Sequence, residues 1–331
     1  MKRILVTGGA GFIGSNIAGM LADHTDYRIV VVDEFGSTDK WRNLSKHRIF
    51  EIIAPGEVFY WLEANKSQLE AIVHMGAISS TTETNVDLIL ATNFTLSRGL
   101  WNWAAQNKKR FIYASSAATY GNGNEGFDDD IKLESLSKLK PLNAYGWSKH
   151  LFDQFVAIAT SGAREAIPPQ WVGLKFFNVY GPNEYHKEEQ RSVVNQIFPH
   201  AQHGRPVRLF HSYREDYKDG EQLRDFVYVK DCVKIVIWLL ANPAVSGLFN
   251  IGTGKARSFK DLATATFAAV GKPPAITYID MPEELRSKYQ YLTEAKMDRL
   301  RAAGYNDPFY SLEDGVKDYV QNYLAKDDQY Y

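Results

Sequence analysis

The glycine-rich stretch VTGGAGFIGSN, residues 6–16, constrains the fold of this chain more than any other segment. It follows a short β-branched run and precedes a helical pattern, and Gly8, Gly11 and Gly14 fall three residues apart within it. Glycines at these places allow a tight turn, close packing of helix on strand, and the approach of a phosphate to the free amides of the helix N-terminus. The stretch therefore predicts a dinucleotide-binding site.

An acidic residue stands where such a site needs one. The next β-branched run, residues 28–32, ends at Asp33, nineteen residues after Gly14. A carboxylate at the end of the second strand accepts hydrogen bonds from the adenine ribose of a dinucleotide. The alternative is a plain glycine turn followed by a strand-ending aspartate, which leaves the register of strand, turn, helix and acid unexplained.

Short strand-like runs alternate with helical segments along the first half of the chain. The strand-like runs are residues 3–6, 28–32, 70–77, 110–116 and 171–181, and the helical segments include 14–22 and 85–107. This alternation favours right-handed βαβ crossovers. The fold class that we predict is α/β, a Rossmann-type doubly wound parallel sheet with a smaller C-terminal substrate-binding lobe.

The domain boundaries follow from where this alternation weakens. We expect an NAD(P)-binding Rossmann domain over residues 1–170, with strand and helix contributions from about 171–180 and 225–255. Residues 181–331 then form mainly the substrate-binding lobe. The glycine- and charge-rich segment 121–140 reads as an exposed loop.

Composition narrows the classes of partner. With 45% hydrophobic and 23% charged residues and a net charge of −1, the chain suits a globular protein with a large core. Basic residues are not interleaved with aromatic ones in any run, so we expect neither nucleic acid nor a membrane as partner.

A single cysteine, Cys232, argues against an internal disulfide and a Cys-rich metal site, and we expect no metal. The longest apolar run near it is far too short to span a bilayer, and the first residues lack a signal-peptide pattern. We expect a cytoplasmic protein that binds small molecules.

A tyrosine and a lysine stand four residues apart in PLNAYGWSKHLFDQF, residues 141–155. An apolar stripe at helical spacing predicts a helix there, which places Tyr145 and Lys149 one turn apart on one face. Free tyrosine titrates near ~10, and a close ammonium together with a positive nicotinamide ring should lower that pKa by about 1–3 units. If a dinucleotide binds beside the pair, Tyr145 can serve as a base. Without a dinucleotide, the tyrosine merely covers the apolar stem of the lysine.

Six segments in order resemble the extended, nucleotide-sugar-modifying branch of the short-chain dehydrogenase/reductase superfamily. They are TGGAGFIG (7–14), HMGAISS (74–80), YASSAATYG (113–121), YGWSK (145–149), FFNVYGP (176–182) and RDFVYVKD (224–231). The resemblance implies that Ser116 hydrogen-bonds the reacting oxygen, that Tyr145 is the acid/base, and that Lys149 binds the nicotinamide ribose. Nucleotide-sugar dehydratases carry an acidic pair where this chain has Ala117, Ala118 and Thr119, so dehydration is disfavoured.

Further segments resemble the ADP-glyceromanno-heptose 6-epimerase family. They are GAISSTTET (76–84), PLNAYGWSKHLFD (141–153), NVYGPNEYHKEE (178–189) and LFNIGTGKARSF (248–259). The resemblance implies epimerisation at C6 of ADP-D-glycero-D-manno-heptose to the L-glycero form, for lipopolysaccharide core, through a tightly bound NADP. It also makes Lys187 a second acid/base, although a lysine in EYHKEE reads as a solvated surface residue without the resemblance.

The family's ligand contacts map onto positions of this chain. The resemblance implies cofactor contacts at Gly8, Gly11, Phe12, Ile13, Gly14, Asp33, Glu34, Lys40, Met75, Gly76, Ala77, Ile78, Ser79, Asn93, Lys149 and Val179. It implies substrate contacts at Asn178, Glu189, Gln196, Phe210, His211, Ser212, Arg224 and Tyr289. A guanidinium such as that of Arg224 clamps a pyrophosphate well, but it also pairs readily with a neighbour such as Asp225.

Several features depart from the family pattern or leave alternatives open. Residues 213–223 look like an insertion, two glutamates follow Lys187 where small residues are expected, and a second cofactor-binding lysine near residue 56 is not evident. Asp33 favours NAD, whereas Lys40 and the resemblance favour NADP. His74 reads as a hydrogen-bonded core histidine.

Two other functions are alternatives to C6 epimerisation. A C4 epimerase or reductase acting on another nucleotide sugar would not need Lys187. A dinucleotide-sensing module is disfavoured because Ser116, Tyr145 and Lys149 are all present. We expect a nucleotide sugar, ADP-heptose, as the partner, and a homo-oligomer.

Overall fold

A seven-stranded parallel sheet forms the body of the protein, in the order β11-β6-β5-β4-β1-β2-β3. The computed structural model describes residues 1–162, 166–286 and 289–331. The strands are β1 (Arg3–Thr7), β2 (Arg28–Val32), β3 (Glu51–Ile53), β4 (Leu69–His74), β5 (Arg110–Ser116), β6 (Trp171–Phe176) and β11 (Gly247–Ile251). The doubly wound α/β fold predicted from the sequence is confirmed.

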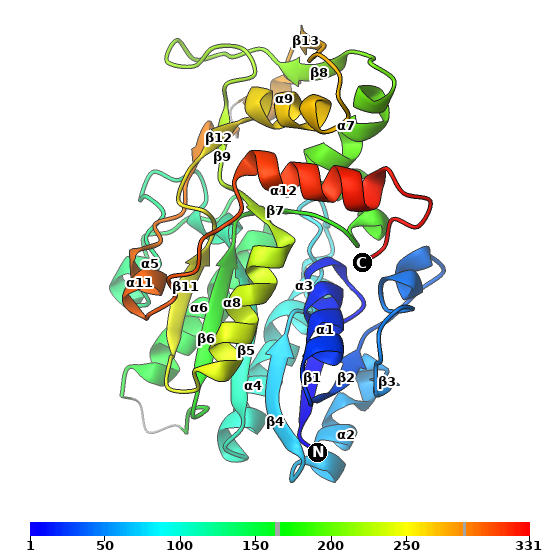
Figure 1. Cartoon of the computed structure of the whole chain (residues 1–331). Coiled ribbons are helices and arrows are strands. Elements are labelled where there is room, and N and C mark those ends of the chain that lie inside the picture. Colours follow the sequence, from blue (N-terminus) through cyan, green and yellow to red (C-terminus); the bar gives the residue numbers. More distant parts are fainter. Residues whose placement is uncertain (163–165, 287–288) are drawn as a thin grey trace.

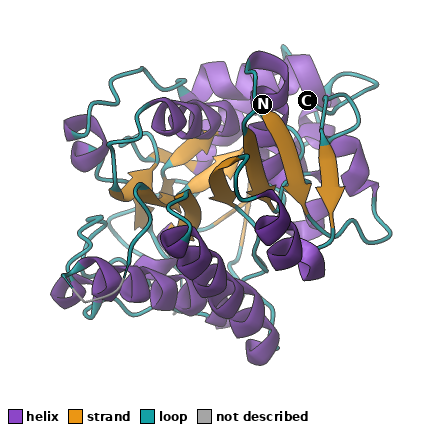
Figure 2. Cartoon of the chain, turned by 90° about the horizontal axis from the view of Figure 1, so that it is seen from below, coloured by secondary structure: helices purple, strands orange, loops and turns teal. Residues whose placement is uncertain are grey.

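Helices cover both faces of this sheet (Figure 2). Helices α1 (Phe12–His24) and α8 (Val229–Ala241) pack on one face, and α2 (Val58–Asn65), α4 (Leu96–Gln106) and α6 (Ala144–Thr160) pack on the other. Strands buried on both faces have no polar side to present, which explains continuous apolar runs such as RIVVV in β2.

The helical segment predicted over residues 85–107 is interrupted. It consists of α3 (Val86–Ile89), a π-helical turn (η3, Leu90–Thr95) and α4. The turn contains Asn93, which is fully buried and whose amide bonds both the N–H and the C=O of Ile78 at 2.8 and 3.0 Å. Asn93 thus ties this π-helical turn, a feature that is common at functional sites, to the segment after β4.

Two expectations about connecting segments need correction. The strand expected over 171–181 splits, because β6 ends at Phe176 and β7 (Asn178–Tyr180) pairs instead with β10 (Phe226–Tyr228) in a separate sheet. The segment 121–140 is partly buried rather than exposed: Phe127 packs against Tyr120, and the Asp129 carboxylate accepts a hydrogen bond of 2.7 Å from the Asn250 amide.

A smaller lobe lies at the carboxyl ends of the strands (Figure 1). Its elements are α7 (Val193–Gln202), β8 (Val207–Phe210), β9 (Leu223–Arg224), β12 (Arg257–Ser258), α9 (Phe259–Ala269), β13 (Ile276–Ile279), α10 (Glu283–Arg286), β14 (Leu292–Thr293) and α12 (Leu312–Tyr319). The short helices α5 (Leu133–Leu136) and α11 (Asp298–Ala302) flank the sheet. Short turns complete the chain: η1 (Asp39–Asn43), η2 (Pro55–Glu57), η4 (Ala117–Tyr120), η5 (Tyr185–Gln190) and η6 (Val320–Leu324).

Strands β6 and β11 of this sheet lie beyond residue 170 in the chain. The boundary between the Rossmann domain and the substrate-binding lobe stays a prediction. Of the helices that the structure describes, none combines the length and the apolar character needed to cross a membrane.

Candidate active site

A cavity of about 1350 Å³ opens where the carboxyl ends of the strands meet the smaller lobe. Four residues predicted to carry the chemistry line it: Ser116, Tyr145, Lys149 and Lys187. It is also lined by nearly every residue predicted to contact a cofactor: Gly8, Gly11, Phe12, Ile13, Gly14, Asp33, Glu34, Lys40, Met75, Gly76, Ala77, Ile78, Ser79 and Val179. The cavity thus unites segments that are more than 170 residues apart in the chain.

The glycine-rich turn forms a cradle that side chains would fill. Gly8 has a φ of 62°, a conformation that side chains disfavour, and a Cβ there would lie 2.6 Å from the Cα of Gly76. A Cβ on Gly14 would collide with the carbonyl of Gly8. Gly11 is the N-cap of α1, so the free amides of the first turn and the helix dipole face the cavity without a side chain in the way. These residues fit the pyrophosphate of a dinucleotide.

Asp33 lies next to the glycine turn and is held there by hydrogen bonds and an ion pair. Its carboxylate accepts hydrogen bonds of 2.8 Å from the amides of Ala10 and Glu34, and it pairs with the Lys40 ammonium at 2.5 Å. The pairing with Lys40 offsets the negative charge that would repel a ribose 2′-phosphate. Asp33 and Lys40, which suggest opposite cofactors when taken separately, therefore act as one neutral unit.

Helix α6 presents the tyrosine and the lysine to the cavity. Asn143 caps the helix, since its side chain accepts a 2.8 Å hydrogen bond from the amide of Gly146. The Lys149 ammonium donates to the carbonyl of Ala114 at 2.9 Å. Burial lowers the pKa of Lys149 to about 8, and the Asp153 carboxylate opposes that shift.

Burial also controls Tyr145. It raises the pKa of the phenol above the usual value, and Ser116 is the described residue that opposes the increase, through a hydrogen bond. Lys149 is not among the groups that shift this pKa, and its ammonium bonds the carbonyl of Ala114. The lowering expected from Lys149 together with a bound nicotinamide stays a prediction.

Lys187 lies in η5, a short 3₁₀ segment with a kink at Glu188, and it lines the cavity. Its ammonium is 5.5 Å from the ring centroid of Phe12, and it forms no ion pair with a carboxylate of the described residues. Burial lowers the pKa of Lys187, and the main opposing charge is Glu184 rather than the exposed Glu188 and Glu189. The interpretation of Lys187 as a solvated surface residue is thus wrong.

The predicted substrate residues divide into two groups. Glu189 lines the cavity, whereas the other predicted substrate residues are not part of its lining. Arg224 is 9% exposed, and its guanidinium stands 5.2 Å from the ring centroid of Tyr289. Phe210 contacts Tyr289 edge-on at 6.3 Å. Asp225 is not the partner of Arg224, because its carboxylate accepts instead from the amides of Thr253, Gly254 and Ala295.

The remaining substrate candidates make other contacts. The segment 213–223 folds back on the strand end before it: Asp219 pairs with the His211 ring at 2.8 Å and accepts from the Ser212 amide at 2.7 Å. The Gln196 side chain donates to the Glu189 carbonyl at 3.0 Å, and Asn178 is exposed on β7.

The sequence did not reveal a buried ion pair beside the residues predicted to be catalytic. Lys175 of β6 and Asp153 of α6 are both fully buried and lie 2.8 Å apart. Asp153 also accepts from Ser115 at 2.7 Å, and Lys175 donates to Thr119 at 2.7 Å, so that both flanks of Ser116 are anchored. The available signal was a lysine inside the apolar run WVGLKFF, since a buried ammonium needs a counter-charge.

Loss of this pair should destabilise the protein. We expect Lys175→Met to lower the free energy of unfolding by about 3–5 kcal/mol, because it leaves the Asp153 carboxylate buried without a counter-charge. Denaturant unfolding measures the change. The double variant Lys175→Met/Asp153→Asn removes both charges and should lose less than the single variant; an equal or greater loss would show that the charge is not the cause.

Two further buried groups support the cofactor side of the cavity. The His74 ring bonds Thr7 at 2.6 Å and Ser97 at 2.8 Å, and burial lowers its pKa to about 3, which confirms it as a core histidine. Asn93 does not line the cavity; it holds Ile78, and its side chain also donates to Ser148 of α6 at 3.0 Å.

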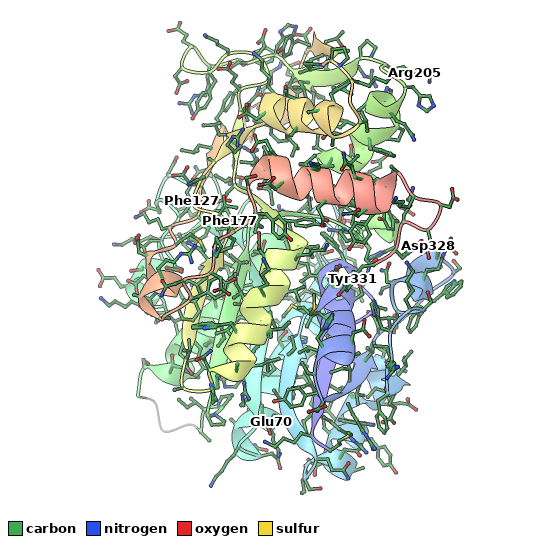
Figure 3. The ribbon with its side chains drawn as sticks, viewed as in Figure 1. Glu70, Phe127, Phe177, Arg205, Asp328 and Tyr331 are labelled. Atoms are coloured by element: carbon green, nitrogen blue, oxygen red, sulfur yellow. The ribbon has the colours of Figure 1, made fainter. Side chains whose placement is uncertain are left out.

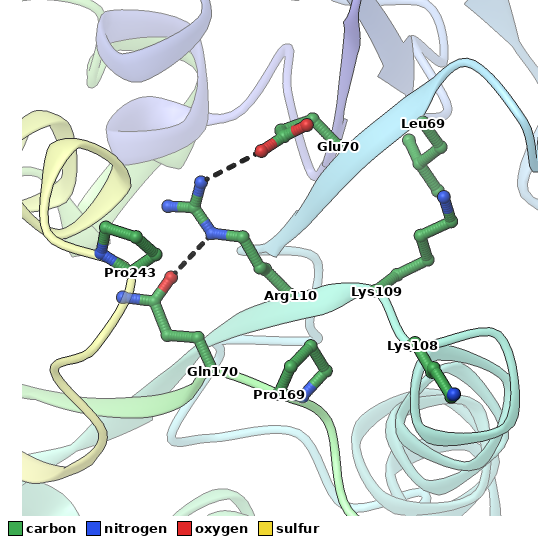
Figure 4. A pocket seen from close by; sticks show the side chains of 8 residues that line it. All are labelled: Leu69, Glu70, Lys108, Lys109, Arg110, Pro169, Gln170 and Pro243. Atoms are coloured by element: carbon green, nitrogen blue, oxygen red, sulfur yellow. Dashed lines mark hydrogen bonds and ion pairs between the residues drawn. The ribbon is translucent and has the colours of Figure 1, made fainter.

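A second hollow, of about 220 Å³, lies at the opposite ends of the strands (Figure 4). Arg110 donates to Gln170 at 2.7 Å and pairs with Glu70 at 3.3 Å across it. The Arg110 guanidinium is thus engaged by two neighbours that line the same hollow.

Comparisons with known proteins identify the family of this chain. The sequence profile of the NAD dependent epimerase/dehydratase family matches residues 4–252. The ADP-L-glycero-D-manno-heptose-6-epimerase of Fusobacterium nucleatum subsp. nucleatum is 48% identical, over 99% of this chain and 99% of its own. The protein of the same name from Nitratidesulfovibrio vulgaris strain DP4 is 48% identical over 98% and 99%. The crystal structure of Helicobacter pylori ADP-L-glycero-D-manno-heptose-6-epimerase superposes with a TM-score of 0.80 at 31% identity, over 97% of this chain and 96% of that chain.

These matches extend over the glycine cradle, the Tyr145–Lys149 helix and the Lys187 turn alike, and they confirm the resemblance drawn from the motifs. The chain therefore belongs to the NAD dependent epimerase/dehydratase family.

Proposed function

We propose that this protein inverts C6 of ADP-D-glycero-D-manno-heptose to give the L-glycero form, a heptose precursor of lipopolysaccharide core, with a tightly bound NADP. The observation that carries the proposal is the convergence of Ser116, Tyr145, Lys149 and Lys187 on one cavity that also contains the glycine cradle. The 48% identity with epimerases of that name supports the choice of substrate.

The protein groups have separate tasks in this reaction. A dinucleotide held by the glycine cradle would supply the hydride chemistry at the sugar carbon, and the residues of the chain do the rest. Tyr145 removes the proton of the hydroxyl on that carbon, Ser116 hydrogen-bonds the same oxygen, and Lys149 holds the nicotinamide ribose. The resulting ketone is planar and must present its other face before the hydride returns.

A second proton-transfer group follows from this geometry. In the turned orientation the oxygen lies elsewhere in the cavity, and one fixed residue serves both orientations only if the sugar rotates about it. Lys187 belongs to η5, separate from the α6 helix of Tyr145, and lines the same cavity. Its lowered pKa makes the neutral amine more accessible. We assign it the proton transfer in the second orientation.

The direct test is incubation of the purified protein with ADP-D-glycero-D-manno-heptose without added cofactor. NMR of the C6 configuration should show conversion to a mixture of the two epimers, because the hydride is returned and no net oxidation occurs. A requirement for stoichiometric NAD(P) would instead indicate a net dehydrogenase. The predicted homo-oligomer is tested separately, by light scattering of the same preparation.

The cofactor should be NADP, held in part by Lys40. Mass spectrometry of the released dinucleotide identifies it. We expect Lys40→Met to raise the dissociation constant for NADP by roughly 10–100-fold and to change that for NAD far less, since the variant leaves Asp33 unneutralised near the 2′-phosphate. Lys66→Met, on an exposed lysine of the same domain, is the control. If NAD alone is released, repulsion of a 2′-phosphate by Asp33 outweighs its attraction by Lys40.

A further inference from the structure

The last residues of the chain leave the smaller lobe and lie against the dinucleotide-binding half. After α12 and η6, residues 326–331, here called the tail, run back toward the N-terminal end of α1, where Figure 3 labels Asp328 and Tyr331. Figure 1 places the end marked C beside α1 as well. No residue of the tail takes part in the proposed reaction.

On one side the tail contacts the segment that leads into Lys187. The Tyr330 ring meets the Tyr185 ring edge-on at 5.1 Å, and the Tyr185 hydroxyl donates to the Gln329 carbonyl at 2.6 Å. The Tyr331 amide donates to the side chain of Asn183 at 2.9 Å. Asn183 is fully buried with a φ of 72°, so its position depends on such contacts.

On the other side the tail contacts the segment that follows Lys40. The Arg42 guanidinium stands 4.6 Å from the ring centroid of Tyr330, and Lys46 pairs with Asp328 at 3.0 Å. The His47 and Tyr331 rings lie 5.1 Å apart. Tyr330 is thus held between Arg42 of η1 and Tyr185 of η5.

The two segments are also joined beneath the tail. The Asn43 amide donates to the carbonyl of Ala10 at 2.8 Å and to that of Asn183 at 3.2 Å, and the Asn183 amide donates to Ser15 of α1 at 3.0 Å. Neither η1 nor η5 belongs to a sheet or a long helix, and Glu188 in η5 has a φ of 50° and a ψ of −119°, which costs free energy in a residue other than glycine. Contacts from outside must therefore hold both turns in place.

The ring of Tyr330 should carry most of the tail's effect. Exposed ion pairs such as Lys46–Asp328 contribute about 0–1 kcal/mol. A cation–π contact and an edge-on aromatic contact each contribute a comparable or larger amount, and Tyr330 makes one of each. The Tyr330 hydroxyl makes no hydrogen bond with a described residue, so phenylalanine should replace tyrosine without loss.

We propose that the tail is a clamp that holds η5 and η1 together through Tyr330, and so positions Lys187 for proton transfer and Lys40 for the cofactor. The first half of the proposal rests on the function assigned above to Lys187. Tyr330 is a positioning residue, since it acts through Lys187 and Lys40 and lies outside the cavity lining.

The test compares Tyr330→Ala with Tyr330→Phe, and Tyr60→Ala, on a tyrosine that is 84% exposed, serves as the surface control. Tyr330→Ala should lower kcat for epimerisation by about tenfold and weaken NADP binding several-fold, while Tyr330→Phe and Tyr60→Ala stay near wild type. Wild-type kcat and NADP affinity in Tyr330→Ala would overturn the clamp.

A double-mutant cycle separates positioning from general destabilisation. If the tail acts through Lys187, Tyr330→Ala should have little further effect on kcat in a Lys187→Met background. An undiminished tenfold loss in that background would show that the tail merely stabilises the fold. Should Tyr330→Ala unfold, Arg42→Ala replaces it in the same cycle, since it removes one contact to the ring and leaves Tyr185 in place.

Failure of the clamp and failure of the proposed function give different results. If the wild-type protein does not epimerise ADP-heptose, the substrate assignment fails whatever the tail does. NADP affinity, measured by titration in the absence of any sugar, still tests the tail in that case. Equal affinities for wild type and Tyr330→Ala would then overturn the clamp on its Lys40 side.

Discussion

Replacing Tyr145 with phenylalanine is expected to lower kcat by roughly 10²–10⁴-fold while the protein keeps its dinucleotide, the range typical for loss of a general acid/base. The hydroxyl is the group proposed to exchange the proton, and phenylalanine keeps the ring that lines the cavity. Burial keeps the phenol protonated in the protein alone, and a nearby positive nicotinamide would favour the phenolate when the reaction starts. Steady-state epimerisation assays with matched cofactor content measure the effect.

Two variants control this experiment. Lys149→Met should lower kcat and loosen the cofactor as well, because Lys149 is assigned to the nicotinamide ribose. Tyr60→Phe, on an exposed tyrosine of α2, should behave as wild type. Substantial epimerisation by Tyr145→Phe would exclude Tyr145 as the essential acid/base and direct attention to Ser116 or Lys187.

Lys187→Met should cause a loss of similar size, about 10²–10⁴-fold in kcat, with the cofactor still bound. The two glutamates that follow Lys187 are exposed and do not oppose the lowering of its pKa by burial, which Glu184 opposes instead. Lys187→Arg distinguishes proton transfer by Lys187 from a role of its positive charge alone. Arginine keeps the positive charge but does not release a proton near neutral pH, so a proton-transfer role predicts that it is as impaired as methionine.

The outcome also decides between a two-group and a one-group mechanism. If Lys187→Met retains near-normal turnover while Tyr145→Phe is inactive, Tyr145 alone transfers the proton in both orientations of the sugar, and the assignment of Lys187 is wrong. Lys66→Met again serves as the matched lysine control. A retained ability to reduce the bound cofactor in Lys187→Met would place the lesion after the first hydride transfer.

Features encoded over a few neighbouring residues could be predicted from the sequence. The glycine turn could be predicted because backbone crowding around Gly8 and Gly14 leaves no room for a side chain. The Tyr145–Lys149 pair could be predicted because helical spacing places both residues on one face. The parallel sheet follows from β-branched runs that alternate with helical patterns. These signals are local, so each segment carries its own evidence.

Pairings between distant segments were decided only in the tertiary structure. Arg224 and Asp225 are neighbours in the chain but bind different partners, whereas Asp33 and Lys40 prove to be one ion pair. The Asp153–Lys175 pair and the contacts of Tyr330 join segments whose spacing in the sequence has no period. A charge or ring is satisfied by whichever group the packed elements bring within reach, and that neighbour is specified by the three-dimensional arrangement rather than by adjacent residues.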